Sequence, residues 1–337
     1  NGLNKLNVTD ATVSTFLFNT DLKNVGGKQV IYKIFDNLDD SNRLWLNTDD
    51  GLFQFDKTTG EIAKPYLNAD AENIVKNNRF YGVHVYDNEN IMFANQQGFL
   101  NYNANTGSVT LNESLGSKFD VDLFHGFIGQ LPGQTDKILV AMSGHLYQFD
   151  RVSGQTQLVY KVSNYQPQSF ETVDSWVVDE HGTLWLAFTG EGLIGVDVNT
   201  FEERYRFDTS NQLLSNFVYG VQLDAYQNVW FSSQAGLYRL DLNNMHVENF
   251  TANDGLIAAE FNAMAYAKLQ NNALAYGGPN GVTLVSPSYF QQKQALTKEV
   301  SVYLSEANML QPERSLSWHE LETGIELPYD SYGLNMQ

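Results

Sequence analysis

Apolar and polar residues recur along this chain in one short pattern, repeated about every 45 residues. The copies align on a reference position that is usually glycine. These reference positions are Gly2, Gly51, Gly98, His145, Gly192, Gly236 and Gly281. An apolar residue follows the reference position directly in each copy, and a second apolar residue comes three positions after the first. A regular repeat of this length is typical of folds built from stacked or radial units.

Two further positions complete the pattern. A small polar residue follows the second apolar one, at Asn7, Asp56, Asn103, Asp150, Asp197, Asp241 and Ser286. Asp and Asn favour turns because their side chains hydrogen-bond the backbone two residues further on. A large residue lies six to seven positions before the reference position in most copies, at Trp45, Met92, Leu139, Trp185 and Trp230, and Ala275 is the exception.

Each copy predicts four short strands joined by turns, as in residues 177–179, 184–187, 193–197 and 203–207. No long stretch has the apolar spacing of a helix, so we expect few helices. The sequence therefore predicts an all-β fold, a β-propeller of about seven four-stranded blades. Six blades are expected to be complete and the N-terminal one partial, because the copy at Gly2 lacks its first two strands; we read the chain as a fragment of a longer protein. A β-solenoid or two β-sandwiches are the alternatives, but sandwiches do not repeat at one fixed step.

The copy from Asp179 to Leu193 closely resembles the two-component regulator propeller repeat. That repeat runs Asp, two residues, Gly, one residue, Leu-Trp-Ile-Gly-Thr, then Gly-Leu and Asp. The copies at 44–56 and 228–241 resemble it nearly as well. The copies around Met92 and Leu139 are degenerate, because those residues replace tryptophan and His145 replaces glycine.

The last copy carries the most specific part of the resemblance. Residues 254–262 (DGLIAAEFN), 274–282 (LAYGGPNGV) and Ser286-Pro287 are similar to the terminal repeat of this family, which precedes an immunoglobulin-like domain named for three tyrosines (Y_Y_Y). The first strand of that domain is expected at 299–304 and a later one at 324–330. We therefore expect a β-propeller over 1–288, and a linker with the opening strands of a truncated Ig-like β-sandwich over 289–337.

The resemblance implies a function as well as a fold. Such propellers form the periplasmic sensing region of inner-membrane signalling proteins whose output is a histidine kinase or a diguanylate cyclase (GGDEF) domain. Relatives respond to carbohydrates, often carry two propellers in series, and act as dimers. The partners implied are an oligosaccharide or another small ligand, and a second copy of the receptor.

Composition narrows the class of partner. The chain has 39 acidic and 20 basic residues and a net charge of −19. Nucleic acids and anionic membrane surfaces bind clustered lysine and arginine, so we expect no nucleic acid partner and no direct membrane contact. The chain has no cysteine, which excludes disulfides and thiolate zinc sites.

The sequence shows no convincing catalytic constellation, and we expect neither a cofactor nor a metal in this region. No two of the six histidines have metal-ligand spacing. The stretch Gly277–Gly281 lacks the Lys-Ser/Thr of a phosphate loop. Two other functions remain open: a propeller enzyme of the lyase or lactonase type, and a protein-interaction scaffold.

A ligand is expected at the face where loops lead into the innermost strands and where the second and third strands join. Aromatic side chains interleaved with amides suit sugars, because ring faces stack and hydroxyls form hydrogen bonds. The candidate binding residues are Tyr81, His84, His125, Trp176, Tyr219, Glu260, Phe261, Asn262, Asn95, Gln96, Gln234 and Asn280.

Overall fold

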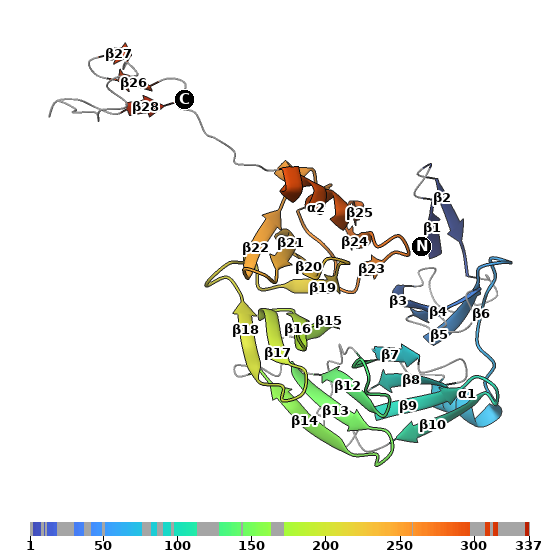
Figure 1. Ribbon diagram of the computed structural model, residues 1–337. Helices are drawn as coiled ribbons and strands as arrows, with labels where there is room; N and C mark the ends of the chain where they lie inside the picture. Colours follow the sequence, from blue (N-terminus) through green and yellow to red (C-terminus); the bar gives the residue numbers. More distant parts are fainter. Residues whose placement is uncertain are drawn as a thin grey trace. The chain divides into compact units, whose positions relative to one another are not determined.

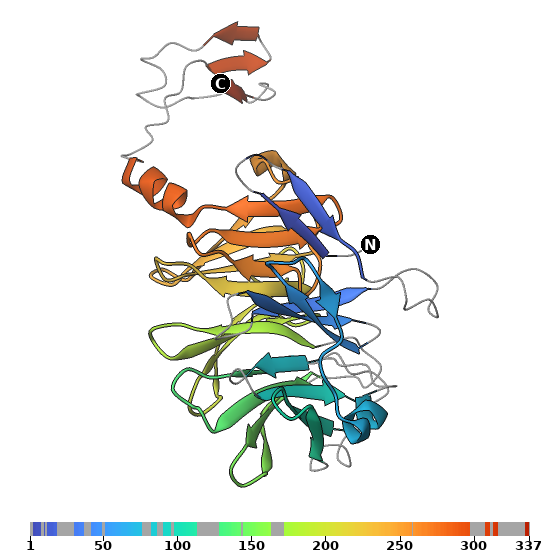
Figure 2. The ribbon, with the colours of Figure 1, turned by 90° about the vertical axis from the view of Figure 1, so that its right-hand side faces the viewer.

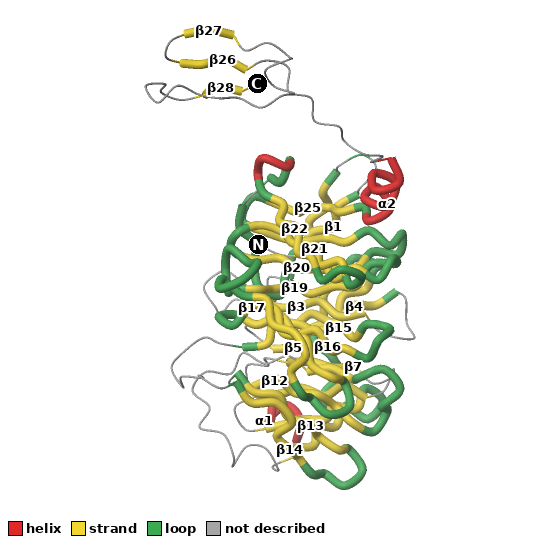
Figure 3. The backbone as a smooth tube through the Cα atoms, turned by 60° about the vertical axis from the view of Figure 1, so that its left-hand side comes forward, coloured by secondary structure: helices red, strands yellow, loops and turns green. Residues whose placement is uncertain are grey.

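The computed structural model describes residues 3–7, 10, 12–18, 30–36, 42–48, 51–75, 82–85, 90–95, 98–112, 128–142, 144–162, 172–257, 259–296, 307–310, 313–315 and 334–336. The chain divides into two compact units, Asn1–Pro287 and Ser288–Gln337. The first unit is almost entirely strand and turn (Figure 3). Its helices in the described ranges are the short α1 (Ala69–Val75) and one 3-10 turn, η1 (Ala252–Asp254).

The strands of the first unit form successive antiparallel sheets, here named blades 1 to 7. Blade 1 is β1 (Leu3–Leu6) and β2 (Val13–Phe16). Blade 2 is β3 (Ile31–Asp36), β4 (Arg43–Thr48), β5 (Gly51–Asp56) and β6 (Ile62–Ala63). Blade 3 is β7 (Gly82–Val85), β8 (Asn90–Asn95), β9 (Gly98–Asn103) and β10 (Ser108–Asn112). Blade 4 is β11 (Ile128–Gln130), β12 (Lys137–Met142), β13 (His145–Asp150) and β14 (Thr156–Lys161).

Blade 5 is β15 (Val173–Val178), β16 (Thr183–Phe188), β17 (Gly192–Asp197) and β18 (Glu203–Phe207). Blade 6 is β19 (Val218–Leu223), β20 (Asn228–Ser233), β21 (Gly236–Asp241) and β22 (His246–Phe250). Blade 7 is β23 (Tyr266–Lys268), β24 (Leu274–Gly278) and β25 (Gly281–Val285).

The blades are arranged about a common centre, with the first strand of blades 2 to 7 innermost, so the predicted β-propeller is confirmed (Figure 1). Figure 2 shows the same blades from the side. Within the described residues blades 2 to 6 have four strands, blade 7 has three and blade 1 has two. The reference residue of every copy that is described opens the third strand of its blade, as the repeat predicted.

The polar residue at the end of each third strand caps the turn that follows. Asp56 Oδ1 accepts hydrogen bonds from the backbone of Thr58 and Thr59, and Asp150 and Asp197 accept the same pair of bonds in their blades. Asn103 does likewise with a neutral side chain. These bonds confirm the turn prediction, and they lower the pKa of each of the three carboxyls because they stabilise the charged form.

Two tryptophans of the repeat, Trp185 and Trp230, donate hydrogen bonds to buried carboxylates in the turns between first and second strands. Asp179 Oδ2 accepts from Trp185 Nε1 at 2.8 Å, and Asp224 Oδ2 accepts from Trp230 Nε1 at 2.8 Å. The other oxygen of each carboxylate accepts two backbone N–H groups of its own turn. The indole rings are fully buried, and Trp185 packs in the core that blade 5 shares with blade 6. The Asp179–Trp185 pair therefore joins a turn to the core between blades 5 and 6.

Glycine at the reference position has a steric cause. Gly192 has φ +89°, and a Cβ there would overlap the Phe207 carbonyl oxygen at the end of the outer strand. Gly236 has the same relation to Phe250. In blade 4, where His145 takes the reference position, the positive φ moves to the preceding Gly144 (φ +70°). The turn of blade 4 therefore also contains one residue with a left-handed backbone, one position before the reference position.

The second unit contains β26 (Ala307–Leu310), β27 (Glu313–Ser315) and β28 (Leu334–Met336), which form a three-stranded antiparallel sheet. The helix α2 (Pro287–Leu296) begins at the last residue of the first unit. The strands expected at 299–304 and 324–330 lie outside the described residues, and the Ig-like assignment stays a prediction. Among the described helices, none is long and apolar enough to cross a membrane.

Candidate functional site

Three of the predicted binding residues meet on one face of the propeller. Tyr219 lies on the innermost strand β19, Gln234 in the turn between β20 and β21, and Glu260 in the segment that leads into β23. The Gln234 side chain and the Glu260 carboxylate both lie close enough to the Tyr219 hydroxyl to affect its pKa. Burial raises the pKa of Tyr219, so the hydroxyl stays protonated at neutral pH. Gln234 and Glu260 are exposed, whereas Tyr219 is only 7% exposed behind them, and we call this group the strand-end site.

Two of the predicted aromatic residues have packing roles instead. Phe261 is 3% exposed and contacts Tyr276 edge-on, with ring centroids 6.2 Å apart. Trp176 on β15 is half-buried and packs against the core between blades 4 and 5. Phe261 is therefore buried, whereas Trp176 keeps part of its surface exposed.

Of the remaining predicted residues apart from His84, three lie within the described part of the chain and three lie outside it. Asn262 and Asn280 are exposed on the same face, and the Asn262 backbone N–H donates to the Gly277 carbonyl at 3.0 Å. Asn95 ends β8, where it pairs in register with Gly98. Tyr81, Gln96 and His125 lie outside the described residues.

His84 lies on the innermost strand β7, as predicted for a residue near the central channel. Burial, with the nearby charges of Arg151 and Lys33, lowers the pKa of His84 to about 4. Lys33 lies on the innermost strand β3 and is half-buried, with protein atoms around its amine. Burial lowers the pKa of Lys33 to about 8, against the opposing attraction of Asp174. The inner strands thus bring titratable groups of blades 2, 3 and 5 together.

Asp174 and Ser175 of β15 are a feature that sequence reasoning missed. Asp174 is 1% exposed, and its two oxygens accept the Gly220 and Met264 backbone N–H groups, each at 2.8 Å. Ser175 Oγ accepts the Val221 N–H at 2.7 Å. Burial raises the pKa of Asp174, which these bonds and Lys33 oppose. Two adjacent polar residues in an otherwise apolar inner strand were the available signal.

A bulge in β19 makes these bonds possible. The register between β19 and β20 shifts between Tyr219 and Gln222, and Gly220 has φ +50°. A bulge turns N–H groups away from the neighbouring strand of the same sheet. Asp174 and Ser175 of blade 5 accept the N–H groups of Gly220 and Val221 in blade 6. Asp174 also accepts the N–H of Met264, which has φ +59°. Blades 5, 6 and 7 are thereby joined beneath the strand-end site.

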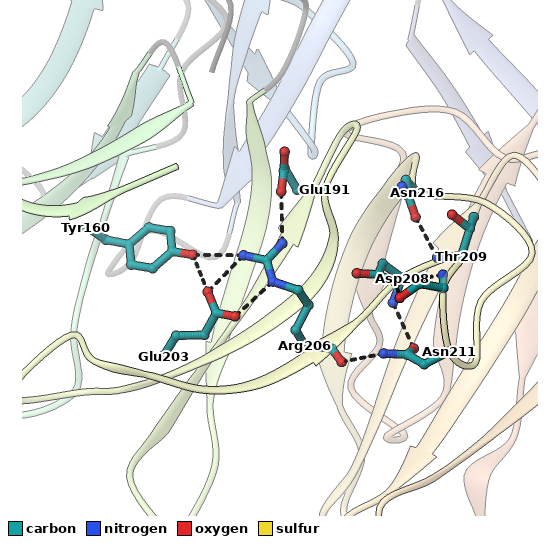
Figure 4. Close-up of polar contacts among 9 residues, drawn as sticks. Tyr160, Glu191, Glu203, Arg206, Asp208, Thr209, Asn211 and Asn216 are labelled. Carbon is teal, nitrogen blue, oxygen red and sulfur yellow. Dashed lines mark hydrogen bonds and ion pairs between the residues drawn. The ribbon is translucent and has the colours of Figure 1, made fainter. Parts of the chain in front are cut away.

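A second polar cluster joins blades 4 and 5 (Figure 4). Arg206 Nη1 donates to Glu191 Oε2 at 2.8 Å, and its Nε donates to Glu203 Oε1 at 2.8 Å. Tyr160 Oη of blade 4 donates to Glu203 Oε2 at 2.8 Å. Glu191, a turn residue of the strand-end face, is therefore occupied by an ion pair. The arrangement favours a role in holding blades together.

This cluster predicts a dependence of stability on pH. The Arg206 hydrogen bond holds the pKa of Glu203 below its ordinary value of 4.5. Because this pKa is lower in the folded chain, the stabilisation is present above pH 4.5 and is lost as the pH falls below it. Arg206→Met should therefore cost about 1 kcal/mol at pH 7, since the groups are partly exposed, and less at pH 3.5. Urea unfolding of both proteins at the two pH values measures this, and a difference independent of pH would contradict it.

No family model matches the chain. Histidine kinase P4 of Formosa agariphila is 36% identical to it over 77 residues, which are 23% of this chain and 6% of that protein. The chain therefore spans a small part of that relative's length, and the shared segment is similar in sequence to a segment of a histidine kinase.

Solved structures share the fold. The extracellular domain of the hybrid two component system BT3049 from B. thetaiotaomicron matches with a TM-score of 0.63 and 17% identity, over 89% of this chain and 38% of that one. Sqt1 from Saccharomyces cerevisiae matches with a TM-score of 0.52 and 11% identity, over 75% of this chain and 70% of that one. At these identities the likeness shows the fold alone.

Proposed function

We propose that this chain is the ligand-sensing propeller of a membrane-spanning signalling protein, that it lies on the periplasmic side, and that it responds to carbohydrate. The observation that carries the proposal is the strand-end site, where a tyrosine hydroxyl, an amide and a carboxylate from three separate segments converge on one face. The similarity to a segment of Histidine kinase P4 supports the signalling context, with a histidine kinase or a diguanylate cyclase as the output.

The charge of the chain narrows the ligand. Glu260 is exposed at the site, and the whole chain carries a net charge of −19. A surface of this sign repels anions and raises no barrier to neutral molecules. A neutral oligosaccharide therefore fits better than a uronate or a sulfated sugar. The hydroxyls of such a sugar would form hydrogen bonds with Gln234 and Tyr219 at the face where blades 5, 6 and 7 are joined.

Binding by the whole 337-residue chain tests this proposal. A panel of neutral and uronate oligosaccharides is screened by thermal shift, and hits are titrated by calorimetry. We expect a neutral oligosaccharide to raise the melting temperature, because a ligand that binds the folded state stabilises it. Tyr219→Phe with Gln234→Ala should weaken the affinity about tenfold, as the loss of two hydrogen bonds predicts.

Gln270→Ala is the matched control, because Gln270 is an exposed amide in the turn between β23 and β24, on the opposite face. It should leave the affinity unchanged. Equal weakening by both variants would contradict the strand-end site. Binding of no carbohydrate in the panel, neutral or charged, would contradict carbohydrate sensing itself.

A further inference from the structure

Two clefts lie on the face opposite the strand-end site, on either side of the turn 131–136 of blade 4. One cleft, of about 360 Å³, lies between blades 3 and 4 and is lined by Asn90, Met92, Asn101, Asp136, Phe149, Arg151 and Val152. The other, of about 330 Å³, lies between blades 4 and 5 and is lined by Gly133, Gln134, Thr135, Asp136, Lys137, Gln148, Val198, Asn199 and Phe201. Asp136 borders both. Figure 1 shows blades 3, 4 and 5 side by side.

Both clefts occur where a tryptophan of the repeat has been replaced. Met92 pairs in register with Asn101, and Leu139 pairs with Gln148. Trp185 occupies the same position in blade 5, where it pairs with Gly195. The indole covers that partner so closely that a Cβ at Gly195 would lie 2.9 Å from the ring. A smaller Met92 or Leu139 leaves the partner uncovered, and in both blades the partner is an amide.

The row across the sheet in blades 3 and 4 differs from the row in blade 5. In blade 5 the outermost residue of the row is Tyr205, which stacks on Trp185 with ring centroids 5.5 Å apart. In blade 3 the outermost residue is Thr110, which pairs with Asn101. In blade 4 it is Gln157, which pairs with Gln148. The row is thus polar at both clefts. Blade 6 also has polar residues in this row, Arg239 and Glu248, but it keeps Trp230 beside them.

The aspartate that binds the indole is replaced together with the tryptophan. Six positions before Trp185 and Trp230 stand Asp179 and Asp224, whereas the same position before Leu139 is Gly133. The turn of blade 4 is also longer than the corresponding turns of blades 5 and 6, because it runs from Leu131 to Asp136 and includes Pro132. Local departures from a repeat that is otherwise consistent are expected at functional positions.

The chemistry of the clefts suits a neutral polyhydroxylated ligand. Each has an apolar floor, which is Met92 and Phe149 in one and Val198 and Phe201 in the other. The rims carry amides, which both donate and accept hydrogen bonds as sugar hydroxyls require. Opposite charges occur together on the rim, with Arg151 beside Asp136, so no net charge selects the ligand. Each volume is at the lower end of the range for small-molecule sites.

We propose that the two clefts form one extended binding site for a neutral oligosaccharide, which crosses the turn 131–136 with one sugar unit in each cleft. The site is separate from the strand-end site and shares only the ligand class of the proposed function. Amides Asn101 and Gln148 orient the units, while the apolar floors take the ring faces.

The test uses the whole chain with cellohexaose, xylohexaose and mannohexaose as probes, titrated by calorimetry. Asn101→Ala with Gln148→Ala should raise the Kd of the bound probe about tenfold, through the loss of one hydrogen bond in each cleft. Gln54→Ala is the matched control, because Gln54 holds the same position in blade 2 beside the intact Trp45. A second variant, Leu139→Trp, restores the indole of the repeat and should also weaken binding, because the ring would cover Gln148, the cross-strand partner of Leu139 that lines the cleft.

The outcomes separate this proposal from the proposed function. Weaker binding in the cleft variants, with Gln54→Ala and the Tyr219→Phe, Gln234→Ala pair unchanged, supports the cleft site. Weaker binding in the strand-end pair alone overturns the cleft site and leaves carbohydrate sensing standing. Failure of all three probes to bind at millimolar concentration also overturns the cleft site, and carbohydrate sensing is then decided by the wider panel.

Discussion

Asp224→Ala is expected to lower the free energy of unfolding by about 3–5 kcal/mol. The carboxylate is 2% exposed and accepts from the backbone of Tyr226 and Asn228, the Asn228 side chain and Trp230 Nε1. Removing it leaves the buried indole N–H and the buried Asn228 donors without an acceptor. An unsatisfied buried donor costs more than the bond itself contributed, because its desolvation is no longer compensated. Urea unfolding, followed by tryptophan fluorescence, measures the loss.

Asp241→Ala is the control for this prediction. Asp241 ends the third strand of the same blade, and its Oδ1 accepts the Asn243 backbone and side-chain N–H groups in an exposed turn. Water can replace those bonds, so the loss should be about 1 kcal/mol or less. Equal losses in the two variants would mean that the Asp–Trp pairs do not hold the blades together.

Gly192→Ala is expected to lower the free energy of unfolding by about 3 kcal/mol or more. One part of this cost is the left-handed backbone, since Gly192 has φ +89°. The larger part is steric, because the new Cβ would overlap the Phe207 carbonyl oxygen and push β18 away from β17. The affected atom belongs to the backbone, so a side-chain rotation cannot relieve the overlap.

Gly154→Ala is the control that separates the conformational cost from the steric cost. Gly154 has φ +69°, and a Cβ there meets no atom within 4 Å. This variant should therefore cost about 1–2 kcal/mol, which is the conformational part alone. Thermal and urea unfolding of both variants give the difference. A loss in Gly192→Ala no larger than that in Gly154→Ala would remove the steric explanation for glycine at the reference position.

The repeat explains why the same substitution has different consequences in different blades. Tryptophan with its aspartate fills the space between one blade and the next at Trp185 and Trp230. Where Met92 and Leu139 stand instead, the blades still form and both residues are buried. Met92 lines one cleft, and Gln148, the cross-strand partner of Leu139, lines the other. Divergence of a repeat can thus create a binding surface without changing the architecture, because each blade forms its own hydrogen-bonded sheet.

The period of the sequence predicted the propeller, the order of strands within each blade and the turns capped by Asp56, Asp150 and Asp197. These features depend on residues close together in the chain, and alternation, turn residues and spacing report such features directly. For the candidate site, the sequence predicted a position and not a function. Tyr219, Gln234 and Glu260 were placed on one face by their position in the repeat, and they lie near one another in the structure; ligand binding there stays a prediction.

The tertiary structure alone decided which polar groups meet between blades. Asp174 bonds Gly220 and Met264, which follow it by 46 and 90 positions, because bulges and a positive φ turn those N–H groups toward it. Trp176 and Phe261 have the composition of a sugar site, yet Phe261 is buried against Tyr276 and Trp176 is half-buried against the core between blades 4 and 5. Local pattern determines which blade a residue belongs to. Contact between blades depends on strand register and on how the side chains of two blades fit together across the interface. Neither can be read from a single sequence.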